Sequence, residues 1–125
     1  MCIGYFDAEK MGTRAPHEID SIMVQCQPHL DRLYASGRVL CDVGISEGAR
    51  SLKRVNASLK ISDAPARESV ETIGGVTLIE ARDIEEAIKL ASLHPATQLP
   101  VGEELGFRME VRPVNYFKSP GEIVK

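Results

Sequence analysis

The spacing of apolar residues predicts a long helix near the start of the chain. Over residues 17–36, apolar side chains recur at steps of three and four, the period of an amphipathic helix. Pro28 falls inside this run and removes a backbone donor, so we expect a kink or a break near Cys26 or Gln27. Gly37 follows the last periodic position and is typical of the residue just after a helix.

A second helical period follows Asp83. This aspartate can cap the helix, and Glu86 three residues later completes a D-x-x-E form of the capping box. Pro95 is expected to end the helix. The apolar stripe of this helix consists of Ile84, Ala87, Ile88 and Ala91.

Four other segments have strand character, and a fifth has the pattern of a hairpin. Residues 75–81 are apolar on both faces, which predicts a central strand. In residues 107–115, Phe107, Met109 and Val111 alternate with Arg108, Glu110 and Arg112. The other expected strands are 2–6 and 38–46, the hairpin covers 51–62 with its turn at Asn56-Ala57, and loops are expected at 7–16, 62–74 and 96–106.

This order of elements predicts an α+β fold. Two β-α-β units with an inserted β-hairpin give the ferredoxin-like βαββαβ plan, an antiparallel sheet with two helices on one face. The other face of the sheet is then left open, although the strand at 75–81 is apolar on both sides. A second copy of the chain, packed sheet against sheet, is the simplest cover, so we expect a homodimer.

Composition narrows the class of protein. The chain has 125 residues, which fits one domain, here taken as residues 1–117 with a flexible tail at 118–125. The net charge of −3, without a dense Lys/Arg cluster, argues against nucleic-acid and anionic-membrane partners. The sequence favours a cytoplasmic protein with free thiols, because its three cysteines show no C-x-x-C spacing. Charged residues near the start replace the apolar run of a signal peptide, and no apolar run is long enough to span a membrane.

Several short motifs resemble one known family. Residues 63–75 contain Asp63-Ala64-Pro65-Ala66, then Glu68, Glu71 and Ile73-Gly74-Gly75. This segment resembles the D-G-P-F-A-E-T-K-E signature, followed by an apolar residue and two glycines, of the DGPF-domain branch of the YCII-related proteins. "GYFDAE", "ASGRVLCDVGI", "LIEARDIEEAIKLA" and "MEVRPV" are similar to further segments of that family in the same order.

The resemblance implies a dimeric α/β barrel built from two ferredoxin-like subunits. Some YCII-like relatives are thought to use a histidine on the first helix, paired with an aspartate, for proton transfer. The segment "QPHLDRL" resembles the one that carries this histidine, which implies His29. The signature differs at Ala64, Ala66 and Val70, and His94-Pro95 stands where the YCII-like branch usually has Asp-Pro.

The predicted catalytic residues are His29 and Asp63. An imidazole with an ordinary pKa near 6.5 exchanges protons at neutral pH, although His29 lies at the edge of the apolar stripe, where an idle surface histidine is equally common. Asp63 could orient the imidazole, or could simply start a turn before Pro65.

The predicted substrate-binding residues are Asp42, Glu68 and Arg112. An isolated carboxylate in an apolar strand, such as Asp42, must face solvent, line a cavity or meet a cation, for which Arg112 and Arg108 are the candidates. Glu68 could hold a proton with its acidic neighbours or be a solvated loop charge. Arg112 could bind a substrate carboxylate or pair with Glu110.

The sequence leaves two functions open. It contains no H-x-x-x-H motif, Cys/His cluster, P-loop or G-x-G-x-x-G, so no metal and no cofactor are expected. The first hypothesis is a cofactor-independent lyase- or isomerase-type enzyme that acts on a small organic molecule, with His29 as the base. The second is a non-catalytic dimeric module that binds a small ligand or a protein.

Overall fold

The computed structural model describes residues 1–46, 48–63 and 71–119, which form an α+β fold with six strands and five helices. The strands are β1 Cys2–Asp7, β2 Val39–Gly44, β3 Arg50–Val55, β4 Ser58–Asp63, β5 Glu71–Ile79 and β6 Arg108–Val111. The helices are α1 Ala8–Gly12, α2 Pro16–Ala35, α3 Ile84–Ala91, α4 Pro95–Gln98 and α5 Val101–Leu105.

Four of the strands form one antiparallel sheet in the order β2-β5-β1-β6. β5 pairs with both β1 and β2, which confirms the prediction of a central strand, although it begins earlier than expected, at Glu71. β3 and β4 form a separate two-stranded sheet. The described strands form an open sheet and a hairpin, with no closed barrel among them.

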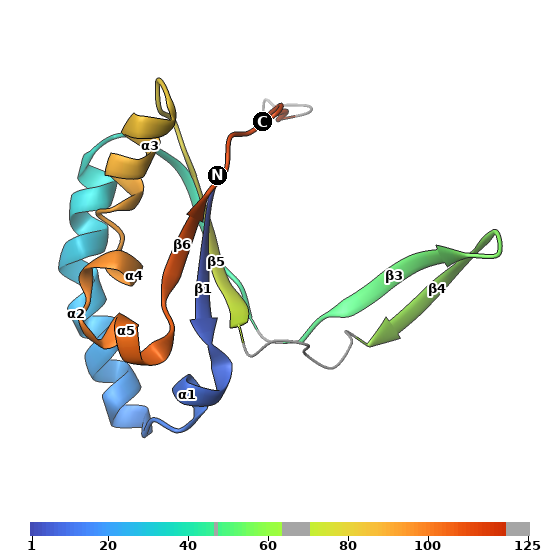
Figure 1. Ribbon diagram of the computed structural model, residues 1–125, viewed down its shortest axis with the longest axis horizontal. Helices are drawn as coiled ribbons and strands as arrows, with labels where there is room; N and C mark the ends of the chain where they lie inside the picture. Colours follow the sequence, from blue (N-terminus) through green and yellow to red (C-terminus); the bar gives the residue numbers. More distant parts are fainter. Residues whose placement is uncertain (47, 64–70, 120–125) are drawn as a thin grey trace, which may run out of the picture.

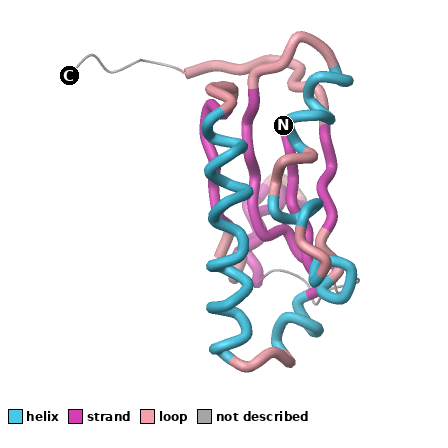
Figure 2. Tube along the Cα trace, turned by 90° about the vertical axis from the view of Figure 1, so that its left-hand side faces the viewer, coloured by secondary structure: helices cyan, strands magenta, loops and turns pink. Residues whose placement is uncertain are grey.

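The helices lie on one side of the four-stranded sheet (Figure 1). Viewed from that side, α2 and a second column of shorter helices lie in front of the strands (Figure 2). We call this side of the sheet the covered face and the opposite side the open face. The prediction of helices on one face is therefore confirmed.

The strand register assigns side chains to these two faces. Residues directly opposite one another on paired strands project to the same side of a sheet. One such row is Asp42, Thr77, Cys2 and Val111. Thr77 and Cys2 in its centre are only 3% and 1% exposed, which assigns the row to the covered face, although Asp42 at its end is exposed. The adjacent row belongs to the open face and consists of Val43, Val76, Ile3 and Glu110.

The core lies between the helices and the covered face. α2 contributes Ile22 and Leu33 from the apolar stripe that its sequence period predicts. Ile22 packs with Leu99 and Leu105 from the segment that follows α3, and Leu105 has no exposed surface. Gly37 has φ of +71°, a left-handed conformation that glycine adopts without strain, and it follows α2 as predicted.

α2 runs without a break through Pro28, so of the expected kink or break near Cys26 or Gln27, the break is wrong and the kink stays a prediction. Proline removes the hydrogen bond to the carbonyl four residues earlier, which belongs to Val24. Val24 is 73% exposed, so water can reach this side of the helix and hydrate the free carbonyl.

Two segments predicted as loops contain short helices. In residues 7–16, the Asp7 carboxylate accepts hydrogen bonds from the backbone N–H groups of Glu9 and Lys10 and so starts α1. Residues 96–106 contain most of α4 and all of α5. α3 ends at Ala91, before Pro95, which occupies the first turn of α4, where a missing backbone donor costs nothing.

The hairpin turns at Asn56-Ala57, as predicted. Both residues have positive φ, +49° and +64°, which matches a two-residue turn of type I′. The hairpin extends away from the open face of the sheet, on the side opposite to the helices (Figure 1). Its own two strands are its main contacts among the described residues.

Gly74 and Gly75 are both part of β5, although Gly74 falls in the segment predicted as a loop. The register between β1 and β5 shifts at Gly4/Tyr5, and Gly74 is the extra residue of this bulge. A Cβ on Gly74 would come within 3.0 Å of the Phe6 ring, and a Cβ on Gly75 within 3.0 Å of the Val43 carbonyl oxygen. Glycine is needed here because neighbouring groups approach closely.

The three cysteines are free. Cys2 is buried and Cys26 is half-buried, and burial raises the pKa of both thiols. Cys41 is exposed on the open face opposite Leu78, although it lies in a largely apolar strand. None of the described helices is long and apolar enough to cross a bilayer.

Candidate functional site

A cavity of about 460 Å³ lies between the covered face, α2 and the start of α4. We call it the sheet–helix cavity. Its polar lining groups include Asp42, Thr77 and His94. Its walls are largely apolar and include Phe6, Met11, Met23, Cys26, Phe107 and Met109. An apolar cavity with a few converging polar groups is the usual form of a small-molecule site.

Asp42 is held in place by two hydroxyl groups. Thr77 Oγ1 donates to Asp42 Oδ1 at 2.8 Å, and the Tyr34 hydroxyl donates to Asp42 Oδ2. The hydrogen bond to Asp42 raises the pKa of Tyr34 to about 12, because it stabilises the protonated phenol. Tyr34 comes from α2 and Thr77 from the central strand, so both layers of the fold fix this carboxylate.

The expected ion pair between Asp42 and Arg108 or Arg112 does not form. Asp42 belongs to the covered face, whereas both arginines project from the open face with Glu110. Of the three environments considered for Asp42, the structure shows two, because this exposed carboxylate lines the cavity and also faces solvent. Its role in substrate binding stays a prediction.

His94 lines the same cavity and caps α4. Its Nδ1 accepts a hydrogen bond from the backbone N–H of Ala96 at 3.0 Å. A neutral imidazole that accepts at Nδ1 carries its proton on Nε2, so Nε2–H is left to donate to a ligand. Burial lowers the pKa of His94, and the Asp42 charge partly opposes this effect.

The sequence contains only a weak signal for His94 as a site residue. Its expected position was the C-terminal end of a helix, where the helix dipole favours a histidine. Instead, α3 ends at Ala91 and His94 is the N-cap of α4. The signal that could have found it is the His94-Pro95 pair, because a polar side chain directly before proline is typical of a helix start.

His29 lies on α2 but is not among the residues that line the sheet–helix cavity. Its Nδ1 is 2.7 Å from Arg32 Nη2 on the next turn of the helix. Cys26 and Leu30, on either side of it in the sequence, face the cavity. The described contacts of His29 include no carboxylate, and its catalytic role stays a prediction.

The other predicted site residues lie apart from one another. Asp63 ends β4 on the hairpin, its side chain is 94% exposed, and its carboxylate is 3.4 Å from Arg50 Nε. Arg112 follows β6 and donates from Nε to Glu110 at 2.6 Å. Glu68, like the signature positions 64, 66 and 70, lies outside the described residues. The structure does not bring His29 and Asp63 together, because α2 and β4 lie on opposite sides of the sheet (Figure 1).

Arg108 organises the charges on the open face. It lies 4.1 Å from the centre of the Tyr5 ring and donates to both Glu71 and Glu110. These hydrogen bonds from Arg108 hold the pKa of both carboxyls below their usual range. Arginines and carboxylates on this face therefore neutralise one another.

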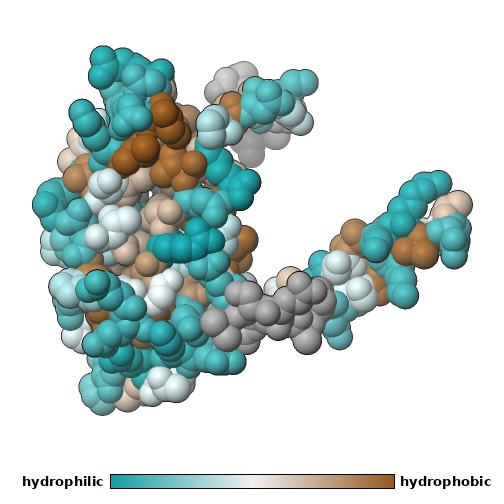
Figure 3. Space-filling view, in the orientation of Figure 1, coloured by the Kyte–Doolittle hydropathy of each residue, from teal (hydrophilic) through white to brown (hydrophobic). Residues whose placement is uncertain are grey.

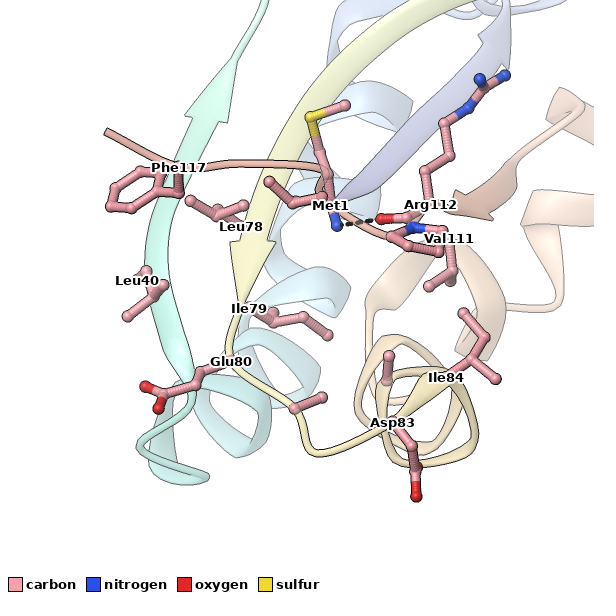
Figure 4. A pocket seen from close by; sticks show the side chains of 14 residues that line it. Met1, Leu40, Leu78, Ile79, Glu80, Asp83, Ile84, Val111, Arg112 and Phe117 are labelled. Carbon is pink, nitrogen blue, oxygen red and sulfur yellow. Dashed lines mark hydrogen bonds between the residues drawn. The ribbon is translucent and has the colours of Figure 1, made fainter. Parts of the chain in front are cut away.

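A second hollow, which we call the end groove, has a volume of about 390 Å³ and lies at the end of the sheet that carries the N-terminus (Figure 4). Its lining includes Leu40, Leu78, Ile84 and Phe117, with Glu80 and Asp83 as acidic groups. The Met1 amino group donates to the Arg112 carbonyl beside it at 2.7 Å. Asp83 already caps α3, and no histidine lines this groove, so it offers less acid–base chemistry than the sheet–helix cavity.

The charges of the sheet–helix cavity restrict what it can hold. Asp42 is the only Asp, Glu, Lys or Arg among the described residues that line it. A ligand carboxylate would meet a like charge without a compensating cation, which is costly in a partly apolar space. In the described part of the chain, no three His, Cys, Asp or Glu side chains are grouped as metal ligands.

The fold and the cavity together define an antiparallel α+β protein with a small-molecule-sized site between its sheet and its helices. The family model of the YCII-related domain matches residues 1–114, nearly the whole chain. The chain belongs to this family, which confirms the resemblance noted in the sequence. No curated protein matches it.

Proposed function

We propose that the protein binds a small, uncharged organic molecule in the sheet–helix cavity and moves a proton to or from it. The observation that carries this proposal is the grouping of Asp42, Thr77 and His94 at the surface of one largely apolar cavity. The walls suit an aromatic or alicyclic body, and the polar groups suit a single hydroxyl or carbonyl on it.

Asp42 and His94 have complementary roles in this proposal. Asp42 accepts a proton from the ligand, either from a hydroxyl or from the carbon next to a carbonyl. The Nε2–H of neutral His94 donates a hydrogen bond to the ligand oxygen on which negative charge develops. Return of the proton to a different carbon completes an isomerisation, and this step needs no cofactor.

Thr77 and Tyr34 are positioning residues in the proposed reaction. Their hydroxyl groups occupy one lone pair on each oxygen of Asp42 and so fix the plane of the carboxylate. The sequence-based alternative, with His29 as the base assisted by Asp63 and with Glu68 and Arg112 as substrate ligands, stays a prediction. His29 would need to leave Arg32 to reach the cavity.

The same cavity also supports a non-catalytic module that binds the ligand without changing it. Binding and turnover separate the two functions. The cavity walls, with three methionines and two phenylalanines among them, would serve either one.

We also propose that two copies pair through their open faces, as ferredoxin-like subunits of a dimeric α/β barrel. The strand order β2-β5-β1-β6 with helices on one face supports this proposal. So do Val43 and Ile73, which remain 46% and 41% exposed on the open face. We further propose that the protein belongs to the DGPF branch of the family. We also propose a cytoplasmic location, which the three free thiols support, because free cysteines are typical of a reducing compartment.

Phenol and benzoate are matched probes of the proposed site. We expect phenol to shift the NMR signals of His94 and of the cavity methionines, and benzoate at the same concentration to leave them unchanged. Asp42→Asn should weaken phenol binding about tenfold or more, because it removes the charged hydrogen-bond acceptor. Glu110→Gln, on the open face, is the control. Equal effects of the two variants would contradict the proposal.

Proton transfer is tested by deuterium exchange. Cyclohexanone incubated with the protein in D₂O should gain deuterium next to its carbonyl faster than in buffer, and Asp42→Asn should abolish this gain. Binding of cyclohexanone without faster exchange would favour the non-catalytic module.

A further inference from the structure

The hairpin of β3 and β4 has one apolar face that nothing in the described chain covers. Leu52 pairs with Ile61 and Arg54 with Leu59, so these four side chains project to one side. Leu52, Leu59 and Ile61 are 63%, 63% and 54% exposed. Figure 3 shows hydrophobic side chains on the hairpin, far from the body of the molecule.

An isolated two-stranded hairpin is at best marginally stable in water, so this one needs a surface to pack against. Its charge indicates what kind of surface. Residues 50–63 contain four basic side chains and one acidic side chain, while the whole chain has 15 Lys and Arg against 18 Asp and Glu. The rest of the chain is therefore acidic and complements the basic hairpin.

The end groove is the second exposed apolar surface. Leu40, Ile84 and Phe117 are 53%, 43% and 64% exposed there. Among its charged lining groups, the carboxylates of Glu80 and Asp83 stand against Arg112 and the Met1 amino group. In Figure 3, hydrophobic side chains also gather at the end of the molecule near α3. The groove thus offers an exposed apolar surface that matches the apolar face of the hairpin.

The hairpin does not lie in the end groove of its own chain (Figure 1). The groove is lined by Leu40 at the start of β2 and Leu78 near the end of β5. The hairpin connects to the opposite ends of these strands, after Gly44 and before Glu71, and extends outward from there (Figure 1). The hairpin therefore lies away from the end groove of its own chain, which leaves the groove open to a hairpin from another molecule (Figure 1).

We infer that the hairpin of one copy docks its Leu52–Leu59–Ile61 face into the end groove of a second copy, and that the exchange is reciprocal. The inference rests on the proposed dimer, because the hairpin extends on the side of the open face and thus toward the partner (Figure 1). Each six-residue strand spans about 20 Å, long enough to cross the roughly 10 Å between two stacked sheets.

Cysteine cross-linking tests the contact directly. In a Cys41→Ser background, Leu59→Cys and Ile84→Cys in the same chain should give a covalent dimer with a short bis-maleimide. Leu59→Cys with Gln25→Cys, on the outer side of α2, is the matched control and should give none. A covalent dimer in neither variant, or equally in both, would overturn the inference.

Sedimentation separates the hairpin contact from the open-face dimer. Leu52→Asp with Leu59→Asp should raise the dimer Kd about 100-fold or more, because each copy loses two docked leucines. Ser51→Asp with Ser62→Asp adds the same charge to the opposite side of the hairpin and should change the Kd less than tenfold. A dimer that both variants leave intact would retain the open-face pairing and exclude the docked hairpin. A monomeric protein that binds RNA through the hairpin would contradict both the open-face dimer and the docked hairpin.

Discussion

The two faces of the sheet differ although adjacent residues of the same strands build them. On the covered face, Asp42 is bound by Thr77 and Tyr34 hydroxyls next to a cavity. On the open face, Val43 is 46% exposed, and Glu110 is held by arginines. The strand alternation thus separates a carboxylate fixed by neutral donors from a row of apolar side chains bordered by ion pairs.

This difference gives each face a separate role in the account. The covered face carries the buried core contacts and the candidate chemistry, whereas the open face carries the proposed association. No side-chain polar atom that is buried in the described part of the chain lacks a hydrogen-bond partner. Substitutions on the two faces should therefore change different measured quantities.

The largest effect on folding should come from the covered side. Leu105→Ala removes a side chain without exposed surface and should lower the free energy of unfolding by about 3 kcal/mol, from lost burial and the cavity left behind. Urea denaturation measures this change. Val24→Ala, at a 73% exposed position of α2, should stay within about 0.5 kcal/mol. Similar losses for both would contradict the assignment of the core.

The second largest loss of folding stability should come from adding a methyl group at a closely packed glycine. Gly75→Ala places a methyl group 3.0 Å from the Val43 carbonyl oxygen, which is backbone and cannot rotate away. We expect a loss of about 1–3 kcal/mol in the free energy of unfolding. Gly44→Ala, opposite Gly75 on β2, meets no atom within 4 Å and is the matched control. A neutral Gly75→Ala would show that β2 and β5 are less closely apposed.

On the open face, a charge should affect association more than folding. Ile73→Lys, at a 41% exposed position, should raise the dimer Kd about tenfold or more by placing an unpaired charge in the interface. Analytical ultracentrifugation over a concentration series measures the Kd. Val24→Lys makes the same change on the outer side of α2 and should leave the Kd unchanged. An unaltered Kd for Ile73→Lys would sink the proposed pairing of open faces.

The smallest effect should be a pH dependence from His94. Burial lowers its pKa in the folded protein below the 6.5 expected when unfolded. The unfolded chain then binds the proton more readily, so stability is fully present above pH 6.5 and declines as the pH falls toward the lowered value. His94→Asn keeps a side-chain acceptor for Ala96 N–H and should reduce this decline, measured by urea denaturation between pH 7 and pH 5. An unchanged slope would argue against a buried, neutral His94.

The sequence predicted the order of the main elements because strand alternation and helical period are local properties. The central position of β5, the turn at Asn56-Ala57 and the end of α2 before Gly37 all follow from such local patterns. The continuity of α2 through Pro28 does not follow from a local pattern, because it depends on whether water reaches the Val24 carbonyl that Pro28 leaves without a hydrogen bond.

The site was harder to predict because it depends on contacts between distant segments. The alternation in β2 implies that Asp42 and Val43 face opposite sides, but only the packing of α2 decides which side is covered. His94 reaches the cavity because α3 ends early and a new helix starts at Pro95. The resemblance to relatives implied His29, whose observed contact is with Arg32 on its own helix.

The central claim is that the sheet–helix cavity, and not the end groove, is the small-molecule site. Intermolecular NOEs between phenol and protein methyl groups test it most directly, because the two hollows have different methyl-bearing side chains. We expect NOEs from phenol to Met23 and Met109, and the loss of these NOEs in Asp42→Asn. NOEs to Leu40 and Ile84 that persist in Asp42→Asn would contradict it.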